Sequence, residues 1–207
     1  RSLEYAPLIN QTILRTQPQA IYSPENIGHF GLALTHYTHF TSPIRRYADL
    51  IVHRALIREF NLGPGGLKDD EVMRLDEICE TISTNERKSM SAEYATTDRF
   101  VARFMEDKVG AEFEGRISGL SRFGLFVALT ESGADGIIPI RTLPDDFYIH
   151  DEEQHALIGR KSRRVYRLGA AITVRLKEAY GMSGSTVFEV VGEGGAEIPG
   201  FVIKRTR

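Results

Sequence analysis

The stretch richest in reactive side chains is HYTHFTSPIRRYADLIVHR, residues 36–54, where rings, histidines and arginines surround a Ser-Pro pair. Ser42 suits the N-cap of a helix. Pro43 suits the first helical position, because a fixed helical φ and a missing N–H are tolerated there. We therefore predict a helix that begins at Pro43. Arg45 then lies in the first turn, beside free backbone amides and the positive end of the helix dipole.

A cation at that end of a helix is unfavourable by up to about 1 kcal/mol unless an anion also binds there. A phosphate held by the helix N-terminus and by the guanidinium of Arg45 would resolve this conflict. The alternative is an ordinary contact between Arg45 and Asp49, one turn later. The rings of residues 36–40 favour the phosphate, because nucleic-acid bases stack on such faces.

The histidines of this stretch are weaker candidates for metal ligands. His36 and His39 are three residues apart in a strand-like segment, so their side chains are expected on opposite sides. No cysteine pair lies near them to complete a zinc site. We therefore predict no metal ligation by these residues.

Positive charge is concentrated locally in a chain whose net charge is only −2, with a pI near 6.3. These overall values argue against a protein that coats nucleic acid by bulk charge. Two basic sets remain, namely the group Arg45, Arg46, Arg54 and Arg58, and the segment RKSRRVYR at residues 160–167. The second set is either a solvated face or an electrostatic guide for nucleic acid.

Helices are expected to position the first set. Apolar residues recur at helical spacing over residues 67–82 and again over residues 90–105. Ser83 and Glu86 have the spacing of a capping box, so we predict a break there, which gives a helical hairpin or a kinked long helix.

Short strands are expected after Lys108. Five segments alternate with Ser, Gly and Asp turns, at residues 111–120, 122–129, 133–140, 171–179 and 185–191. Five strands with an irregular insert before the fourth suit a small closed barrel such as an OB-fold. In a flat strand Phe123 and Phe126 would face opposite sides, one in the core and one on the surface, but a bulge at Gly124 would turn both rings outward.

The segment GHFGLALTHYTHFTSPIRRYADLIVHRAL, residues 28–56, resembles the signature of the ribonuclease II and ribonuclease R family of exoribonucleases. That family follows its catalytic (RNB) domain with an RNA-binding barrel of the ribosomal-protein-S-one type. The resemblance covers essentially the whole chain and implies an α+β fold. Residues 1–107 would be the helical C-terminal part of an RNB catalytic domain, residues 108–191 the five-stranded OB barrel, and residues 192–207 a loosely attached tail.

The activity that the resemblance implies is processive 3′-to-5′ hydrolysis of single-stranded RNA, and of structured RNA as a further substrate, to nucleoside 5′-monophosphates. In the family the arginine of TSPIR contacts the phosphate at the cleavage site, which implies a catalytic role for Arg45. His39, Ser42 and Arg46 would line the RNA channel. In the barrel, Phe123 and Phe126 would stack on bases, while Arg116, Arg122, Arg163 and Arg164 would contact the RNA backbone.

Magnesium is the cofactor that the resemblance implies for the complete enzyme. The aspartates that hold it in the family lie well upstream of TSPIRRY, and no aspartate precedes residue 28 here. We therefore expect a C-terminal fragment that holds no metal and does not hydrolyse RNA alone. A non-catalytic RNA-binding adaptor would also explain the missing aspartates, and an α+β protein in which the motif is only structural is a third interpretation.

Location and partners follow from simpler features. The longest apolar run is far shorter than the roughly 18 residues that would span a bilayer, and the N-terminus RSLEYAPLIN has no signal-peptide block. We expect a cytoplasmic protein with no membrane partner. Single-stranded RNA is the expected ligand, with RNA-decay or ribosome-associated proteins as candidate partners.

Overall fold

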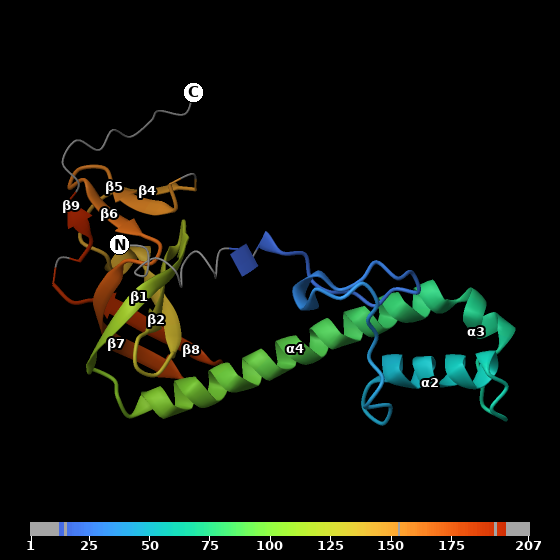
Figure 1. The fold of residues 1–207 in the computed structure, drawn as a ribbon. Helices are drawn as coiled ribbons and strands as arrows, with labels where there is room; N and C mark the ends of the chain where they lie inside the picture. The colour runs from blue at the N-terminus through green and yellow to red at the C-terminus, as the bar shows by residue number, and fades with distance from the viewer. Residues whose placement is uncertain (1–12, 15, 153, 193, 198–207) are drawn as a thin grey trace. The chain divides into compact units, whose positions relative to one another are not determined.

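Helices come first along the chain and strands follow, as the α+β pattern of the sequence predicts (Figure 1). The structure is a computed structural model that describes residues 13–14, 16–152, 154–192 and 194–197. The chain divides into two compact units. The helical unit comprises residues 17–93, and the barrel unit comprises the described residues from 94 onward.

The helical unit contains η1 (Phe30–Leu32), α2 (Tyr47–Glu59), α3 (Asp69–Met73) and the first part of α4 (Leu75–Glu106). The prediction that a helix begins at Pro43 is wrong, because α2 begins at Tyr47 and Arg46 is its N-cap. The carbonyl of Ser42 instead accepts hydrogen bonds from the backbone N–H groups of Arg45 (3.2 Å) and Arg46 (3.0 Å). A tight turn therefore precedes the helix, and Arg45 lies in that turn.

The break predicted at Ser83 is also absent, because α4 runs without interruption through this position. The Ser83 hydroxyl donates a hydrogen bond to the carbonyl of Cys79, one turn earlier, at 2.8 Å. The same oxygen accepts a hydrogen bond from the backbone N–H of Tyr22 at 2.9 Å. A serine that resembles a cap in the sequence thus joins a distant segment to the middle of a helix. None of the described helices combines the length and the apolar character that crossing a membrane requires.

The barrel unit contains the five predicted strands, which close into a barrel in the order β1-β2-β3-β8-β7. The strands are β1 (Glu112–Ser121), β2 (Gly124–Leu129), β3 (Asp135–Pro139), β7 (Ala171–Tyr180) and β8 (Ser185–Val190). All neighbours pair antiparallel except β3 and β8, which close the barrel in parallel through Ile137 and Val187. Inward-facing residues at alternate positions, among them Leu125, Val127 and Phe188, are fully buried and form its core.

The insert predicted as irregular is instead ordered, and this prediction is wrong. After η2 (Ile140–Thr142) come three short strands, β4 (Tyr148–Asp151), β5 (Ala156–Gly159) and β6 (Arg164–Arg167). They form a second sheet in the order β4-β5-β6-β9, in which β9 is Ala196–Glu197 (Figure 1). Tyr148, Leu157 and Tyr166 of this sheet belong to the same buried cluster as the barrel core.

Two residues of the predicted loose tail are therefore paired with β6, and residues 198–207 lie outside the described part of the chain. The last turns of α4 also belong to the barrel unit. Ala102 and Met105 are buried there, and a Glu106 Oε1 atom accepts a hydrogen bond from the N–H of Gly181 at 2.9 Å. The end of α4 is thereby fixed to the turn between β7 and β8.

Candidate functional site

The turn before α2 is organised by a buried carboxylate. Asp49, the third residue of α2, is completely buried. Its Oδ2 atom accepts hydrogen bonds from the backbone N–H of Ser42 (2.8 Å) and from Nη2 (2.8 Å) and Nε (3.2 Å) of Arg46. Although burial opposes ionisation, these hydrogen bonds hold the pKa of Asp49 below its ordinary value. The carboxylate therefore ties both ends of the turn to the helix.

Arg45 differs from the other three arginines of the first basic set. Arg46 pairs with Asp49, Arg54 pairs with Glu71 at 2.6 Å, and Arg58 pairs with Asp69 at 2.6 Å. The side chain of Arg45 is exposed and makes no ion pair or hydrogen bond with any described residue. The alternative in which Arg45 pairs with Asp49 is wrong, because the Asp49 carboxylate pairs with Arg46 through Oδ2 and forms no ion pair with Arg45.

A cavity of about 560 Å³ opens beside this turn, within the helical unit. Arg45, Arg46 and Arg74 line it, together with Tyr22, Glu77 and Glu86. Arg46 is neutralised by Asp49, and Arg74 lies 3.5 Å from a carboxylate oxygen of Glu77. Arg45, which no described carboxylate pairs with, thus brings positive charge to a cavity large enough for a phosphate and an attached sugar.

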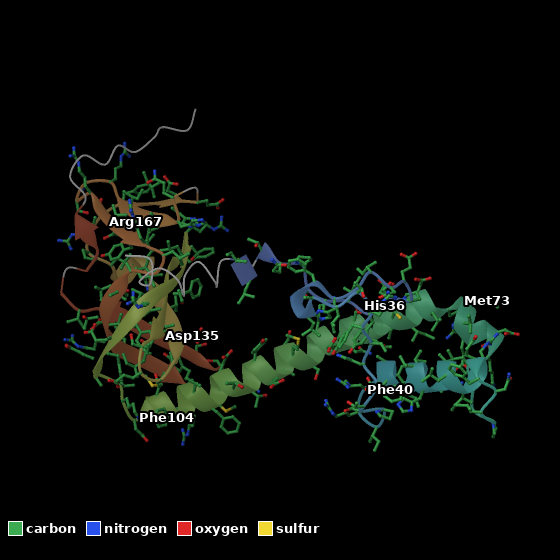
Figure 2. The ribbon with its side chains drawn as sticks, in the orientation of Figure 1. His36, Phe40, Met73, Phe104, Asp135 and Arg167 are labelled. Carbon is green, nitrogen blue, oxygen red and sulfur yellow. The ribbon has the colours of Figure 1, made fainter. Side chains whose placement is uncertain are left out.

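The rings before the turn contact one another. His39 Nδ1 lies 2.9 Å from the Tyr22 hydroxyl, and the two rings meet edge to face. Phe40, which is labelled in Figure 2, stacks on His53 of α2. The two ring centroids are 4.3 Å apart. Tyr37 remains partly exposed between His39 and His29. These contacts fix the segment in place and leave part of the Tyr37 and Phe40 faces accessible to a base.

Tyr22 is a site residue that sequence reasoning missed. Its hydroxyl reaches His39 and lies 3.5 Å from Glu86, while its backbone bonds to Ser83, 61 residues away. Burial first, and the Glu86 carboxylate second, raise the pKa of this hydroxyl. No spacing rule links residues so distant in sequence, so the pattern gave no indication of Tyr22.

On the barrel, both predicted phenylalanines point outward. Phe123, in the turn between β1 and β2, is 63% exposed, and Phe126, on the outer side of β2, is 42% exposed. Gly124 between them has φ +151°, and a Cβ there would overlap the carbonyl oxygen of Ile138. The irregularity in the ladder lies in β1, between Ile117 and Gly119, rather than at Gly124. Neither ring lies in the core.

The arginines predicted to contact RNA around this platform lie in different settings. The guanidinium of Arg122 stands over the Phe123 ring, 4.8 Å from its centroid. The Arg116 side chain donates a hydrogen bond to the carbonyl of Gly169 at 3.1 Å. Arg163 is exposed in the turn between β5 and β6, and Arg164 is half-buried at the start of β6. The barrel unit thus presents an aromatic pair with one adjacent cation, and a separate basic turn.

Comparison with known proteins explains this combination. The family described as RNB domain matches residues 2–61, and the family described as S1 RNA binding domain matches residues 106–179. Ribonuclease R of Aquifex aeolicus (strain VF5) is 44% identical over 168 residues, which cover 81% of this chain and 24% of that protein. The chain is homologous to ribonuclease R. Ribonuclease R 1 of Lactococcus lactis subsp. lactis (strain IL1403) is 42% identical over 184 residues, covering 88% of this chain and 22% of that protein.

Solved structures agree with this assignment. The apo form of Mycoplasma genitalium RNase R superimposes with a TM-score of 0.81 at 34% identity, covering 91% of this chain and 30% of that one. The same protein in complex with ribose methylated single-stranded RNA also gives a TM-score of 0.81. The chain spans about a quarter of the length of the curated relatives it matches. The RNB match contains the Arg45 turn, and the S1 match contains Phe123, Phe126 and the basic turn.

Magnesium is the metal that the family resemblance implies, and the side chains here do not fit it. Within the described part of the chain, no three His, Cys, Asp or Glu side chains are grouped so that they could hold a metal ion. Asp49, the buried carboxylate next to Arg45, is already bound to Arg46 and Ser42 through one oxygen. The described residues of the candidate site therefore offer phosphate-binding groups rather than a set of metal ligands.

Proposed function

We propose that this chain is part of a 3′-to-5′ exoribonuclease that shortens single-stranded RNA, and structured RNA as well, to nucleoside 5′-monophosphates. In this proposal Arg45 binds the phosphate being cleaved, and His39, Ser42 and Arg46 lie along the path of the RNA. The barrel unit binds the RNA strand. Homology to ribonuclease R over more than four-fifths of the chain supports the proposal.

The proposal rests on the guanidinium of Arg45, which lines the cavity and has no partner among the residues that the structure describes. A guanidinium forms two parallel hydrogen bonds to phosphate oxygens and gains strength as negative charge grows in the transition state. An arginine already paired with a carboxylate would lose that pair before it could act. Asp49 takes up Arg46 and leaves Arg45 available, so the turn presents one cation to an anionic substrate.

The barrel unit contributes affinity without a requirement for a particular sequence. Phe123 and Phe126 offer exposed faces on which any base can stack, each worth about 1–3 kcal/mol. Arg122, held over the Phe123 ring, supplies a cation for the adjacent phosphate. An enzyme that degrades RNA one nucleotide at a time needs such tolerance. Proteins of RNA decay or of the ribosome are candidate partners in the cell.

The test is a substitution in the complete ribonuclease to which this chain is assigned. Arg45→Ala should lower turnover of 5′-labelled single-stranded RNA by orders of magnitude, while RNA affinity falls little. Arg58→Ala is the matched control, because Arg58 pairs with Asp69 and does not line the cavity. If Arg45→Ala turned over RNA at the wild-type rate, Arg45 would not be a residue of the active site. Tight binding with no shortening of RNA by the complete wild-type protein would favour a non-catalytic adaptor.

A further inference from the structure

The turn between β5 and β6 presents three cations on a rigid backbone. Arg160, Lys161 and Arg163 are exposed, and none of their side chains makes an ion pair or hydrogen bond with a described residue. Charged side chains whose only role is to contact water do not require a backbone with a fixed conformation. The conformation of this turn is, by contrast, held by several contacts.

The contacts converge on Asp146, which precedes β4. Its carboxylate accepts hydrogen bonds from the backbone N–H of Lys161 at 2.9 Å and of Ser162 at 2.8 Å, and from the Ser162 hydroxyl at 2.6 Å. Desolvation opposes ionisation, yet the hydrogen bonds from Ser162, Lys161 and Phe147 hold the pKa of Asp146 well below its usual range. The carboxylate therefore stays charged and bound to the turn.

Two backbone features show how closely the turn is fitted to this carboxylate. A Cβ on Gly159 would lie 2.5 Å from Asp146 Oδ2 and 2.5 Å from the Ser162 hydroxyl, so no larger residue fits there. Arg163 has φ +57°, in the left-handed region that residues with a Cβ rarely adopt. A bulky, charged residue in that region costs about 1–3 kcal/mol, which the surrounding contacts must offset.

An exposed aromatic ring belongs to the same arrangement. The backbone N–H of Phe147 donates to Asp146 Oδ1 at 2.6 Å, and its carbonyl accepts a hydrogen bond from the N–H of Arg160 at 2.9 Å. The Phe147 side chain is 65% exposed. A large apolar ring is thus displayed beside the cationic turn, on the backbone that the same carboxylate fixes.

We propose that this turn and Phe147 form a second binding site for single-stranded RNA, located on the β4-β5-β6-β9 sheet and additional to the Phe123 and Phe126 platform. Arg160, Lys161 and Arg163 bind backbone phosphates, and Phe147 stacks on a base. Asp146 is a positioning residue that holds the turn in its binding conformation. The inference rests on the proposed function in one respect, namely that the ligand of the barrel unit is RNA.

The exposed ring of Phe147 favours single-stranded RNA over a duplex as the ligand. A duplex offers phosphates but no unstacked base for Phe147, whereas a single strand offers both. The two sites also lie within reach of one strand. The N–H of Ile140 donates to the carbonyl of Phe123 at 2.8 Å, and the segment 140–147 spans at most about 25 Å even when fully extended.

The experiment measures binding of a fluorescently labelled single-stranded RNA to this chain by anisotropy over a range of salt concentrations. Lys161→Gln and Arg163→Gln should each reduce the slope of log K against log salt by about 1. The matched control is Arg99→Gln, which removes an exposed charge on α4 and should leave the slope unchanged. Phe147→Ala should weaken single-strand binding by about 5- to 150-fold and leave duplex binding unchanged, and Phe147→Tyr should restore it.

Asp146→Asn tests whether Asp146 positions the turn between β5 and β6, and a comparison with Phe123→Ala shows whether the barrel still folds. Asp146→Asn should reduce the RNA affinity and the slope of log K against log salt. Lys161→Gln should then cause a smaller loss of RNA affinity in the Asp146→Asn protein than in the wild type. The loss caused by Phe123→Ala should be the same in both backgrounds if the barrel stays folded. Unchanged salt slopes in Lys161→Gln and Arg163→Gln, with Phe123→Ala still weakening binding, would overturn this inference alone. No RNA binding by the wild-type chain would overturn the proposed function as well.

Discussion

Asp49 binds Arg46, the second arginine of the turn before α2, and leaves Arg45, the first, without a partner among the described residues. The two neighbouring arginines therefore have different roles. Arg46 and the Ser42 backbone fix the turn to the helix through one buried oxygen, and Arg45 extends to the cavity. Substitutions at these positions should accordingly have different consequences.

Asp49→Asn should destabilise the helical unit, whereas Arg45→Gln should not. The asparagine removes the charge that pairs with Arg46 inside the protein, and an arginine that loses its buried partner destabilises the fold. We expect the thermal unfolding midpoint of Asp49→Asn to fall by several degrees and that of Arg45→Gln to stay at the wild-type value. In the complete ribonuclease, displacement of the turn should also lower turnover by about 100-fold. Equal melting temperatures for both variants would contradict the clamping role of Asp49.

The ion pair between Arg54 and Glu71 should make stability depend on acidic pH. Hydrogen bonds from Arg54 first, and from the Lys68 backbone second, lower the pKa of Glu71 to about 2. A carboxylate whose pKa is lower in the folded state stabilises the protein above its ordinary pKa, near 4.5, and this contribution is lost as the pH falls through about 2. The urea midpoint of the wild type should therefore decrease between these values.

Glu71→Gln should flatten that part of the pH dependence, because the group that titrates is gone. Asp70→Asn provides the control, since Asp70 is exposed on the same helix and forms no ion pair with a described residue. It should leave the slope as it is in the wild type. A wild-type slope retained in Glu71→Gln would assign the acid sensitivity to another group.

Gly124→Ala should destabilise the barrel strongly. The added methyl group would overlap the carbonyl of Ile138 in β3, and the backbone there has φ +151°. Gly133→Ala is the comparison, because Gly133 also has a positive φ, of +68°, but has open space around its Cβ position. Backbone strain alone costs about 1–3 kcal/mol, so Gly124→Ala should exceed Gly133→Ala by the cost of the overlap. Chemical denaturation curves give the free energy of unfolding of both variants. Equal losses of stability would mean that β3 shifts to accommodate the added methyl group.

Replacing Phe123 or Phe126 by alanine should change RNA binding more than stability. Neither ring belongs to the buried core, so their removal leaves the core intact. If each stacks on a base, each substitution should weaken single-stranded RNA binding by about 1–3 kcal/mol. Phe188→Ala is the contrasting variant, because this buried ring should cost about 3–5 kcal/mol of folding stability. Unchanged RNA affinity in both exposed variants would rule out the platform.

The barrel could be predicted from the sequence because its information is local. All five strands are short apolar-rich segments bounded by Ser, Gly and Asp turn residues, and β1 and β7 also alternate apolar and polar residues. The outward direction of Phe123 and Phe126 was predicted through a bulge at Gly124, whereas in the structure Phe123 lies in the turn before β2 and the ladder irregularity is in β1. Four-residue strands such as β5 and β6 are too short for any periodicity to show, so the second sheet could not be predicted.

The helix start was mispredicted because a hydrogen bond between residues seven positions apart in the sequence outweighed the local preference for a helix cap. Ser42 and Pro43 have the types of a helix start, but the Ser42 N–H is bound by Asp49 and the chain turns instead. Arg45 stays a candidate site residue, because its exposure beside the cavity does not depend on which residue begins the helix. The cavity could not be found in this way, since Tyr22 reaches it through Ser83, far along the chain.

The pairing of β9 with β6 has a consequence for solubility. Strand β6 lies between β5 and β9, so the first two residues of β6, Arg164 and Val165, pair on their outer side with Glu197 and Ala196. An uncovered strand edge is a template on which other chains can add strands and aggregate. By covering part of the edge of β6, the short glycine-rich segment after the barrel should limit self-association. Deleting residues from Gly195 onward should make the barrel unit prone to form insoluble oligomers.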